Sequence, residues 1–322
     1  MLKTKLYIKS TVSYWQTCCE ITAKFYSAVF VHSKTNTDWC YQSQVSCNNT
    51  CKGPEEWATI IPMCGQRKQS PINIVTNQVL PDHRLTPVQF KGYQETFSSV
   101  ILNNGHTVQV NLPNSAVING ADLGAAYKTH QCHLHWGKNG GHGSEHTIDG
   151  EQYPMELHIV HVRENYKSLE EAVGDPSGVA VLGFFYEESE TANKKYEPFI
   201  NSLNNITFPG TNATLEAVSV DMLIPSHDTL EKYFRYQGSL TTPDCSEAVV
   251  WTIFEQTIPL SKEQLSAFSN LRFNNRSAMI NTYRPVQPRY GREVYHSGSY
   301  IFYVSTMLFV SSVLTTLYVH TN

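Results

Sequence analysis

Short stretches in which apolar and polar residues alternate run through the middle of the chain, between about residues 37 and 296. They include SVILNNGHTVQVNLP, AAYKTHQCHLHWG, YPMELHIVHV and SEAVVWTIFEQ, and clusters of Gly, Pro and Asn separate them. Because successive side chains of a strand point to opposite faces, a period of two predicts half-buried strands. Helical periodicity is confined to short segments such as 196–203 and 261–270, the second opened by Ser261 as its N-cap. We therefore expect one mostly β domain.

Composition sets broad limits on function. The 322 residues are 41% hydrophobic, which is enough for a large core. The formal net charge is −4 and Lys and Arg form no cluster, so we expect no nucleic-acid partner. Eight cysteines without paired CxxC spacing argue against a Cys-only zinc site and leave disulfides or inert thiols. Four N-x-S/T triplets favour secretion weakly. The glycosylation candidates are Asn48, Asn205, Asn212 and Asn275.

The C-terminal end carries an apolar tail. Residues 300–319 contain no charge and no proline, and as a helix they would rise about 30 Å, enough to cross a bilayer. Only three residues follow, and none is Lys or Arg. This ending favours a tail that is removed when a glycolipid (GPI) anchor is attached, over a retained single span. Small residues precede the tail, and Ser297 is the candidate attachment site.

The N-terminal segment is a poor match to a signal peptide. Lysines interrupt it repeatedly and leave only 25–31 as a short apolar run. Either that run directs entry into the secretory pathway, or the first residues are not those of the mature product. We divide the chain into an atypical targeting segment (1–36), a catalytic domain (37–296) and a hydrophobic tail (297–322).

Three histidines have the spacing of a metal site. Alternation along 127–136 places one set of side chains on a common face: Tyr127, Thr129, Gln131, His133 and His135. Imidazoles at i and i+2 lie about 6–7 Å apart, a span that one metal ion can bridge. His158, on the strand 156–162, would supply a third nitrogen. Gln131 and Glu156, each two residues from a histidine on its own face, would accept the remaining ring N–H groups.

This ligand set predicts zinc. Three neutral ligands leave Zn²⁺ its full double charge and one open position, which lowers the pKa of a bound water so that hydroxide is available at neutral pH. The other two histidines of these strands, His130 and His161, are expected to be ordinary surface or core residues.

Eight segments in order resemble the alpha-class carbonic anhydrases over about 260 residues. They are QSPINI (69–74), LNNGH (102–106), HLHWG (133–137), GSEHTIDG (143–150), ELHIVH (156–161), VAVLGFF (179–185), GSLTTP (238–243) and YRPVQP (283–288). The resemblance implies the mostly β fold of that family: a central, twisted, largely antiparallel sheet of about ten strands with short peripheral helices. It also implies zinc-hydroxide-mediated, reversible hydration of carbon dioxide to bicarbonate and a proton.

The resemblance assigns roles to individual residues. His133, His135 and His158 match the zinc ligands, with Gln131 and Glu156 as their partners. Thr241 matches the hydroxyl that donates to a carboxylate, Glu145, and orients the nucleophile, and Thr242 borders bicarbonate. The apolar wall for carbon dioxide corresponds to Val160, Val181, Leu240, Val249 and Trp251. His106 matches the proton shuttle, and Asn104 and Gln109 match the residues that order its water chain.

The resemblance also assigns the cysteines. Cys64 and Cys245 match a disulfide of secreted and membrane-anchored members. Cys40 with Cys51 resembles a second bridge of the glycolipid-anchored type IV branch, with Cys47 as a competing partner. Cys132 resembles a free core thiol. Asp244 stands where the family commonly has a second proline, a departure that would loosen the substrate-side loop or alter inhibitor contacts.

We expect the domain on the extracellular face of the plasma membrane, held by the tail or by its anchor. The sequence identifies no protein partner. Two other hypotheses have less support: an inactive binding module with the same fold, and a different zinc hydrolase or a nucleophile enzyme. All three ligand histidines are present, which disfavours the first, and no HExxH or GxSxG motif supports the second.

Overall fold

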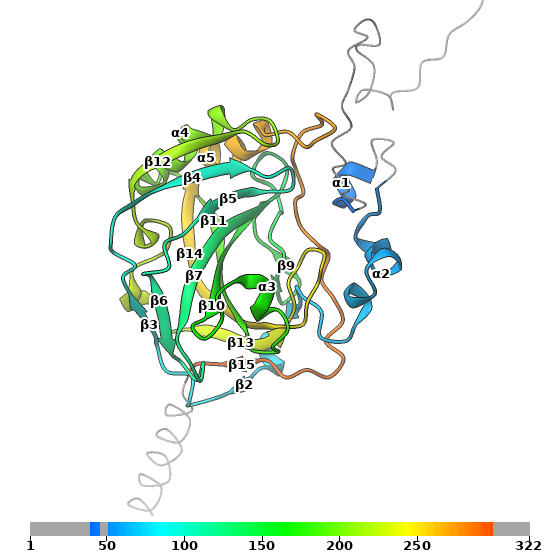
Figure 1. Cartoon of the computed structure of the whole chain (residues 1–322), viewed down its shortest axis with the longest axis vertical. Coiled ribbons are helices and arrows are strands. Elements are labelled where there is room, and N and C mark those ends of the chain that lie inside the picture. The colour runs from blue at the N-terminus through cyan, green and yellow to red at the C-terminus, as the bar shows by residue number, and fades with distance from the viewer. Residues whose placement is uncertain (1–38, 46–50, 299–322) are drawn as a thin grey trace, which may run out of the picture.

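The computed structural model describes residues 39–45 and 51–298 (Figure 1). Several expectations therefore lie outside the described residues: the targeting segment 1–36, the sequon at Asn48, the competing Cys47 and the apolar stretch 300–319. Within the described part, no helix combines the length and apolar character needed to span a membrane.

A large twisted sheet organises the domain. Within the described residues it has 12 strands, whose main path runs β12-β4-β5-β7-β10-β11-β14-β13-β15-β2, and β6 joins β3 to β7. The strands are β2 (Leu80–Pro81), β3 (Val88–Lys91), β4 (Phe97–Asn103), β5 (Val108–Asn111), β6 (Val117–Gly120), β7 (Tyr127–Trp136), β10 (Met155–Arg163), β11 (Val179–Ser189), β12 (Asn212–Val218), β13 (Tyr233–Gly238), β14 (Val249–Ser261) and β15 (Tyr295–His296). A small second sheet contains β1 (Asn73–Ile74), β8 (Thr147–Ile148) and β9 (Glu151–Gln152).

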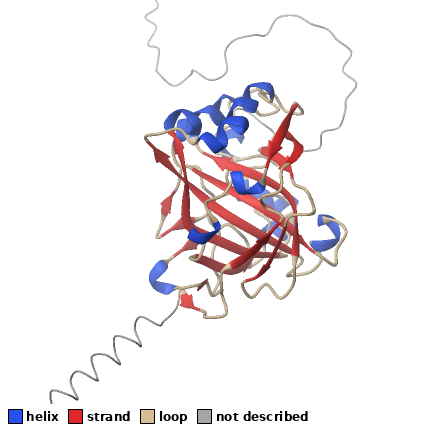
Figure 2. Ribbon diagram, turned by 90° about the vertical axis from the view of Figure 1, so that its left-hand side faces the viewer, coloured by secondary structure: helices blue, strands red, loops and turns tan. Residues whose placement is uncertain are grey.

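Helices are short and lie at the periphery of the sheet, as Figure 2 shows. The α-helices are α1 (Gln42–Val45), α2 (Trp57–Ile60), α3 (Leu169–Ala172), α4 (Glu197–Ser202) and α5 (Lys262–Ala267). The 3₁₀ turns are Pro54–Glu56, Pro62–Gly65, Thr76–Gln78, Lys138–Gly140, Lys194–Tyr196, Leu203–Asn205, Val220–Met222, His227–Thr229 and Phe268–Asn270. At α5, Ser261 and Gln264 form a capping box that satisfies two otherwise unpaired N–H groups.

The expected fold class is confirmed, with more strands than the expected ten or so. In the large sheet only β11 with β14 and β15 with β2 pair in parallel, and the other pairings are antiparallel. The additional strands include two-residue pieces such as β2 and β15, which are too short to produce an alternation pattern.

One assignment of side chains to a face is wrong. Opposite β10, the register passes from Val160 paired with Gln131 to His161 paired with Thr129, so His130 is an extra residue in β7. Such a β-bulge reverses the alternation. Tyr127 consequently packs in the main core, and Thr129 is buried opposite His161, instead of sharing the face of His133 and His135. His130 itself is exposed.

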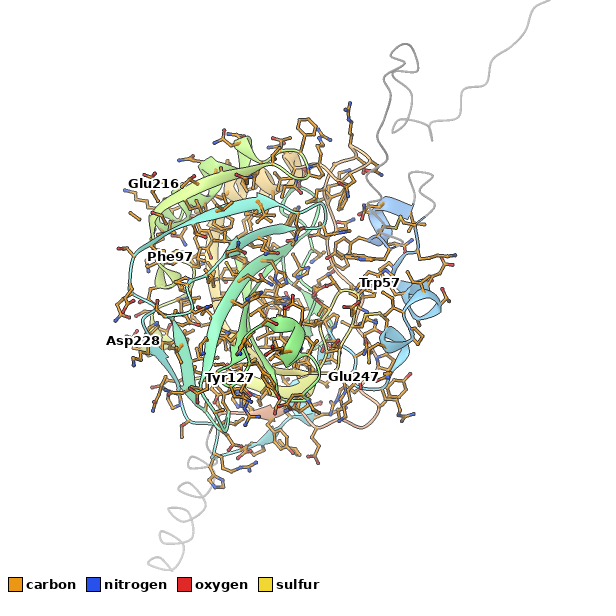
Figure 3. The ribbon with its side chains drawn as sticks, in the orientation of Figure 1. Trp57, Phe97, Tyr127, Glu216, Asp228 and Glu247 are labelled. Carbon is orange, nitrogen blue, oxygen red and sulfur yellow. A yellow bond between two sulfur atoms is a disulfide. The ribbon has the colours of Figure 1, made fainter. Side chains whose placement is uncertain are left out.

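Two apolar clusters lie on opposite faces of β10. Leu157 and Ile159 belong to the larger cluster, which also contains Cys132, Leu134 and Trp136 of β7. Val160 and Val162 belong to a smaller cluster on the same side as His158. Figure 3 shows side chains filling the space around these central strands.

Two disulfides stabilise the irregular segments. Cys40 pairs with Cys51, which resolves the choice that the sequence left open, and Cys64 pairs with Cys245 across a separation of 181 residues. The second bridge fixes the segment that follows Thr241 to the turn after α2. Cys132 is free and buried.

The bulge at His130 allows the register of β7 to be tested. His130→Ala should change the free energy of unfolding by less than about 0.5 kcal/mol, because the side chain is exposed. Deleting His130 should lower the free energy of unfolding by about 4 kcal/mol or more, because Tyr127 and Thr129 would move out of the core. Urea unfolding of both variants measures the difference. Equal stability of the two variants would contradict the assigned register.

Candidate metal centre

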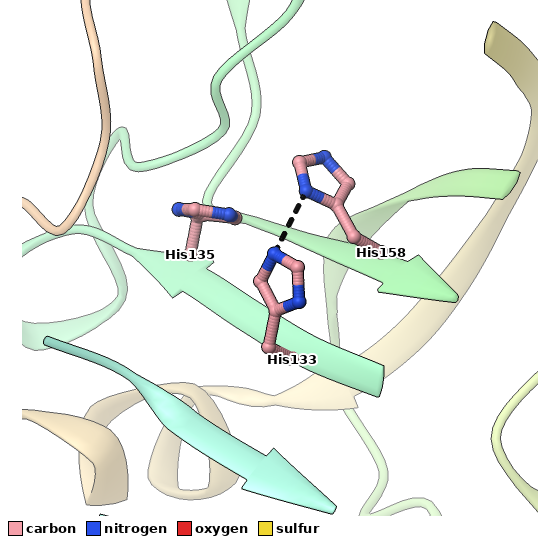
Figure 4. Close-up of side chains that lie close together, drawn as sticks. All are labelled: His133, His135 and His158. Carbon is pink, nitrogen blue, oxygen red and sulfur yellow. Dashed lines mark hydrogen bonds between the residues drawn. The ribbon is translucent and has the colours of Figure 1, made fainter. Parts of the chain in front are cut away.

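Three imidazole rings converge on the inner strands of the sheet (Figure 4). His133 and His135 come from β7, and His158 comes from β10 directly opposite His133 in the register. One nitrogen of each ring lies within 4.8 Å of the corresponding nitrogens of the other two. His158 Nδ1 and His133 Nε2 lie 3.3 Å apart. The antiparallel pairing of two adjacent strands thus brings together the three histidines named from the sequence.

Each ring uses its other nitrogen for a hydrogen bond that fixes its orientation. His133 Nδ1 lies 3.0 Å from Gln131 Oε1, and His158 Nε2 lies 2.7 Å from Glu156 Oε1. His135 Nδ1 lies 2.6 Å from the backbone carbonyl oxygen of Thr282. With these N–H groups donated outward, the remaining ring nitrogens present lone pairs to one another.

Sequence reasoning missed the partner of His135. The acceptor is a main-chain carbonyl, so the identity of side chain 282 gives no signal for it. In the sequence, only the YRPVQP motif, which begins directly after Thr282, drew attention to this region.

Burial keeps the three rings neutral. Desolvation lowers the pKa of His133 and His158, and it lowers the pKa of His135 to about 3. Nε2 of His135 is buried and has no hydrogen-bond partner among the described residues. Three converging neutral nitrogen donors, one of them otherwise unpaired, are the donor set of a zinc site with an open position. The residues present therefore fit zinc.

Glu156 holds His158 in place through a hydrogen bond and is itself fixed by several others. Its Oε1 accepts from His158 Nε2 and from His146 Nδ1, both at 2.7 Å. Its Oε2 accepts the backbone N–H groups of Glu145 and His146, both at 2.8 Å. Burial opposes ionisation, but the two histidines and these hydrogen bonds outweigh it, and the pKa of Glu156 falls well below its usual range. His146, Glu156 and His158 therefore form a hydrogen-bonded group instead of a second ion site.

Glu145 and Thr241 are both buried, and Glu145 lies beside His135 and His158. Burial and the neighbouring Glu156 raise the pKa of Glu145, whereas interaction with the Thr241 hydroxyl and the backbone N–H of Arg284 opposes the rise. Oε2 of Glu145 lies 3.4 Å from His135 Nε2. A divalent cation bound by the rings would favour the carboxylate form at this distance.

The five residues named for an apolar wall meet in the smaller cluster. Val160, Val181, Val249 and Trp251 are buried there together, and the half-buried Leu240 packs against them. The ring centroid of Trp251 lies 4.8 Å from that of His158, so the apolar surface directly adjoins the three converging histidines. Thr242 is half-buried, and its carbonyl oxygen accepts the N–H of Cys245 at 2.8 Å. Asp244 is exposed.

His106 lies in the turn between β4 and β5. Its ring stacks on Trp39, with centroids 4.0 Å apart and planes inclined by 14°. Desolvation in this position lowers the pKa of His106 to about 4. Asn104 accepts the backbone N–H of His106 and donates to Gln109, so the three residues form one polar edge. Trp39 was missed because nothing in the local sequence links it to residue 106.

Three sequon asparagines lie in the described part of the chain, and Asn205, Asn212 and Asn275 are all exposed. Ser297 lies just beyond β15. Its N–H and its hydroxyl donate to carbonyl oxygens of Tyr233 and Glu231, at 3.1 and 2.7 Å.

Comparison with known proteins agrees with this geometry. The family model for eukaryotic-type carbonic anhydrase matches residues 52–298. Carbonic anhydrase 4 of rabbit (Oryctolagus cuniculus) is 41% identical over 262 residues, which cover 80% of this chain and 84% of that protein. Carbonic anhydrase 15 of mouse (Mus musculus) is 36% identical over 269 residues, covering 80% and 82%. Carbonic anhydrase 7 of Homo sapiens is 37% identical over 250 residues, covering 75% and 93%.

The match spans most of the chain and includes the strands that carry the three histidines. The resemblance seen in the sequence is thereby confirmed: the chain belongs to the eukaryotic-type carbonic anhydrase family, a family of enzymes whose general reaction is the hydration of carbon dioxide.

Proposed function

We propose that this chain is a zinc-dependent carbonic anhydrase that interconverts carbon dioxide with bicarbonate and a proton. The observation that carries the proposal is that three neutral ring nitrogens converge while the other nitrogen of each ring forms a hydrogen bond elsewhere. His133, His135 and His158 would hold the ion. Zinc with three histidine ligands lowers the pKa of a coordinated water to about 7, an effect for which carbonic anhydrases are the standard example.

The residues around the rings suit this reaction. Carbon dioxide is uncharged and weakly hydrated, so an apolar surface can hold it, and the wall formed by Val160, Val249 and Trp251 supplies one. The hydroxyl group of Thr241 would donate a hydrogen bond to Glu145. The oxygen of Thr241 could then only accept a hydrogen bond from the attacking nucleophile. That fixed direction aims the nucleophile at the carbon atom. Thr242 would border the bicarbonate product.

His106 would carry the proton to buffer. In the position stacked on Trp39 its low pKa disfavours proton uptake from a group that titrates near neutrality. Transfer is therefore expected when the ring leaves the stack and regains a pKa near 6.5. Asn104 and Gln109, on the same polar edge, would order the water molecules along the route.

Attachment to the outer surface of the plasma membrane is the second part of the proposal. The two disulfides suit an oxidising compartment, and the exposed Asn205, Asn212 and Asn275 are accessible for glycosylation. Ser297 is the candidate anchor residue. Because it is hydrogen-bonded to the domain, an anchor there would hold the domain close to the membrane.

Removing one nitrogen donor tests the metal site. His135→Ala should weaken zinc binding by more than about 100-fold, because changes to the partners of zinc ligands alone cost about 10- to 100-fold. His130→Ala, on the exposed side of the same strand, is the matched control and should retain about one zinc per chain. Metal analysis and stopped-flow hydration of carbon dioxide give the two readouts. Full zinc content and turnover in His135→Ala would refute the site.

The shuttle role of His106 has a distinct kinetic signature. His106→Ala should reduce turnover at least about ten-fold in dilute buffer, because proton export becomes limiting. Concentrated imidazole should restore most of the loss by accepting the proton directly. His130→Ala should show no such dependence on buffer. An equal loss at both buffer concentrations would exclude the shuttle role.

The form of membrane attachment can be decided by enzymatic release. Phosphatidylinositol-specific phospholipase C should transfer carbon dioxide hydration activity from washed membranes to the supernatant, because it cleaves the lipid from a glycolipid anchor. A second anchored protein on the same cells serves as the control for cleavage. Activity that stays on the membrane while the control protein is released would favour a retained span.

A further inference from the structure

The hydroxyl group of Tyr236 is buried in β13 between two polar partners. It lies 2.6 Å from His146 Nε2 and 2.8 Å from Ser70 Oγ. The tyrosine is 1% exposed, and desolvation raises its pKa, so the group remains a neutral hydroxyl. Tyr236 has no direct part in the proposed binding of carbon dioxide or of the metal ion.

One branch leads from Tyr236 to a metal ligand. His146 uses its second nitrogen, Nδ1, to reach Glu156 Oε1 at 2.7 Å. The same carboxylate oxygen accepts from His158 Nε2, also at 2.7 Å. Three short hydrogen bonds thus join the tyrosine hydroxyl to the ring of His158. All four side chains are buried, where hydrogen bonds to an ionised carboxylate are strong.

The other branch leads to the loop that carries Thr241. Ser70 Oγ accepts the backbone N–H of Ser239 at 3.0 Å, and Ser239 Oγ accepts the N–H of Ser70 at 2.9 Å. The carbonyl oxygen of Ser239 accepts from Trp251 Nε1 at 3.0 Å. Ser239 immediately precedes Leu240 and Thr241. This reciprocal pair therefore fixes the start of the substrate loop and one edge of the apolar wall.

Two motif glycines make room for this network. A Cβ atom on Gly238 would lie 2.2 Å from Ser70 Oγ and 2.7 Å from Tyr236 Cε2. A Cβ atom on Gly183 would lie 2.6 Å from Ile253 Cδ1 and 3.4 Å from Glu156 Oε1. No side chain fits at Gly238 without displacing Ser70 or Tyr236. The glycines of GSLTTP and VAVLGFF thus have a physical explanation in the packing behind the metal centre.

We propose that Tyr236 is a positioning residue whose hydroxyl couples the orientation of His158 to the position of the Ser239–Thr241 loop. The inference rests on the proposed zinc function. Loss of the hydroxyl would leave His146 Nε2 and Ser70 Oγ each without one buried partner. Both would then shift to find another, and Glu156 and Ser239 would shift with them.

Tyr236→Phe removes the hydroxyl and keeps the ring, and Tyr233→Phe is the matched control. Tyr233 is buried on the same strand and donates to the carbonyl oxygen of Thr86 at 2.7 Å, away from the centre. Zinc release into excess chelator should be about 3- to 10-fold faster in Tyr236→Phe than in wild type, a smaller effect than the about 10- to 100-fold expected for Glu156→Gln. Tyr233→Phe should release zinc at the wild-type rate.

Two further variants separate positioning from a general loss of stability. In a Glu156→Gln background, Tyr236→Phe should add no further acceleration, because the branch to His158 is already broken. Ser70→Ala should raise KM for carbon dioxide and leave the rate of zinc release unchanged, because it breaks only the loop branch. Equal zinc release from the two phenylalanine variants, when wild type binds zinc, would overturn the inference alone. A wild-type protein that binds no zinc would overturn the proposed function and the inference with it.

Discussion

The antiparallel pairing of β7 with β10 is the constraint on which the site depends. It sets His133 opposite His158 and places His135 opposite Glu156, so the three converging histidines and the carboxylate that orients one of them belong to a single rigid ladder. A slip of one residue would turn all of these side chains to the opposite face. The pairing is held by the large apolar cluster on the other face, where Leu134 packs opposite Leu157. Stability on one side of the sheet therefore maintains chemistry on the other.

The sequence could predict the parts of this arrangement that follow from local period. Alternation located the long strands, and it grouped His133 with His135 and His158 with Glu156. It could not predict the extra residue at His130, because a bulge depends on the pairing with a neighbour and leaves no pattern in its own strand. The error therefore fell on Tyr127 and Thr129, which lie beyond the bulge.

Contacts between distant segments were equally invisible. The carbonyl of Thr282 orients His135 from 147 residues away, and a main-chain acceptor carries no signature in the side chain. The stacking of Trp39 on His106 depends on a short N-terminal segment that is tied to the domain by a disulfide. The family resemblance supplied roles for the ring of His106 but not the environment that lowers its pKa. Only the folded structure contains that information.

The parallel pairing of β11 with β14 has a consequence for how the protein acquires its site. These strands carry Val181, Val249 and Trp251, yet the chain leaves the end of β11 and forms α4 and the far-edge strand β12 before it returns to form β13 and then β14. Closing so long a loop costs entropy before any contact repays it, and parallel pairing of this kind is slow. We therefore expect this apolar surface to be completed late during folding. Changes in remote elements such as β12 would then delay the completion of this surface without contacting it.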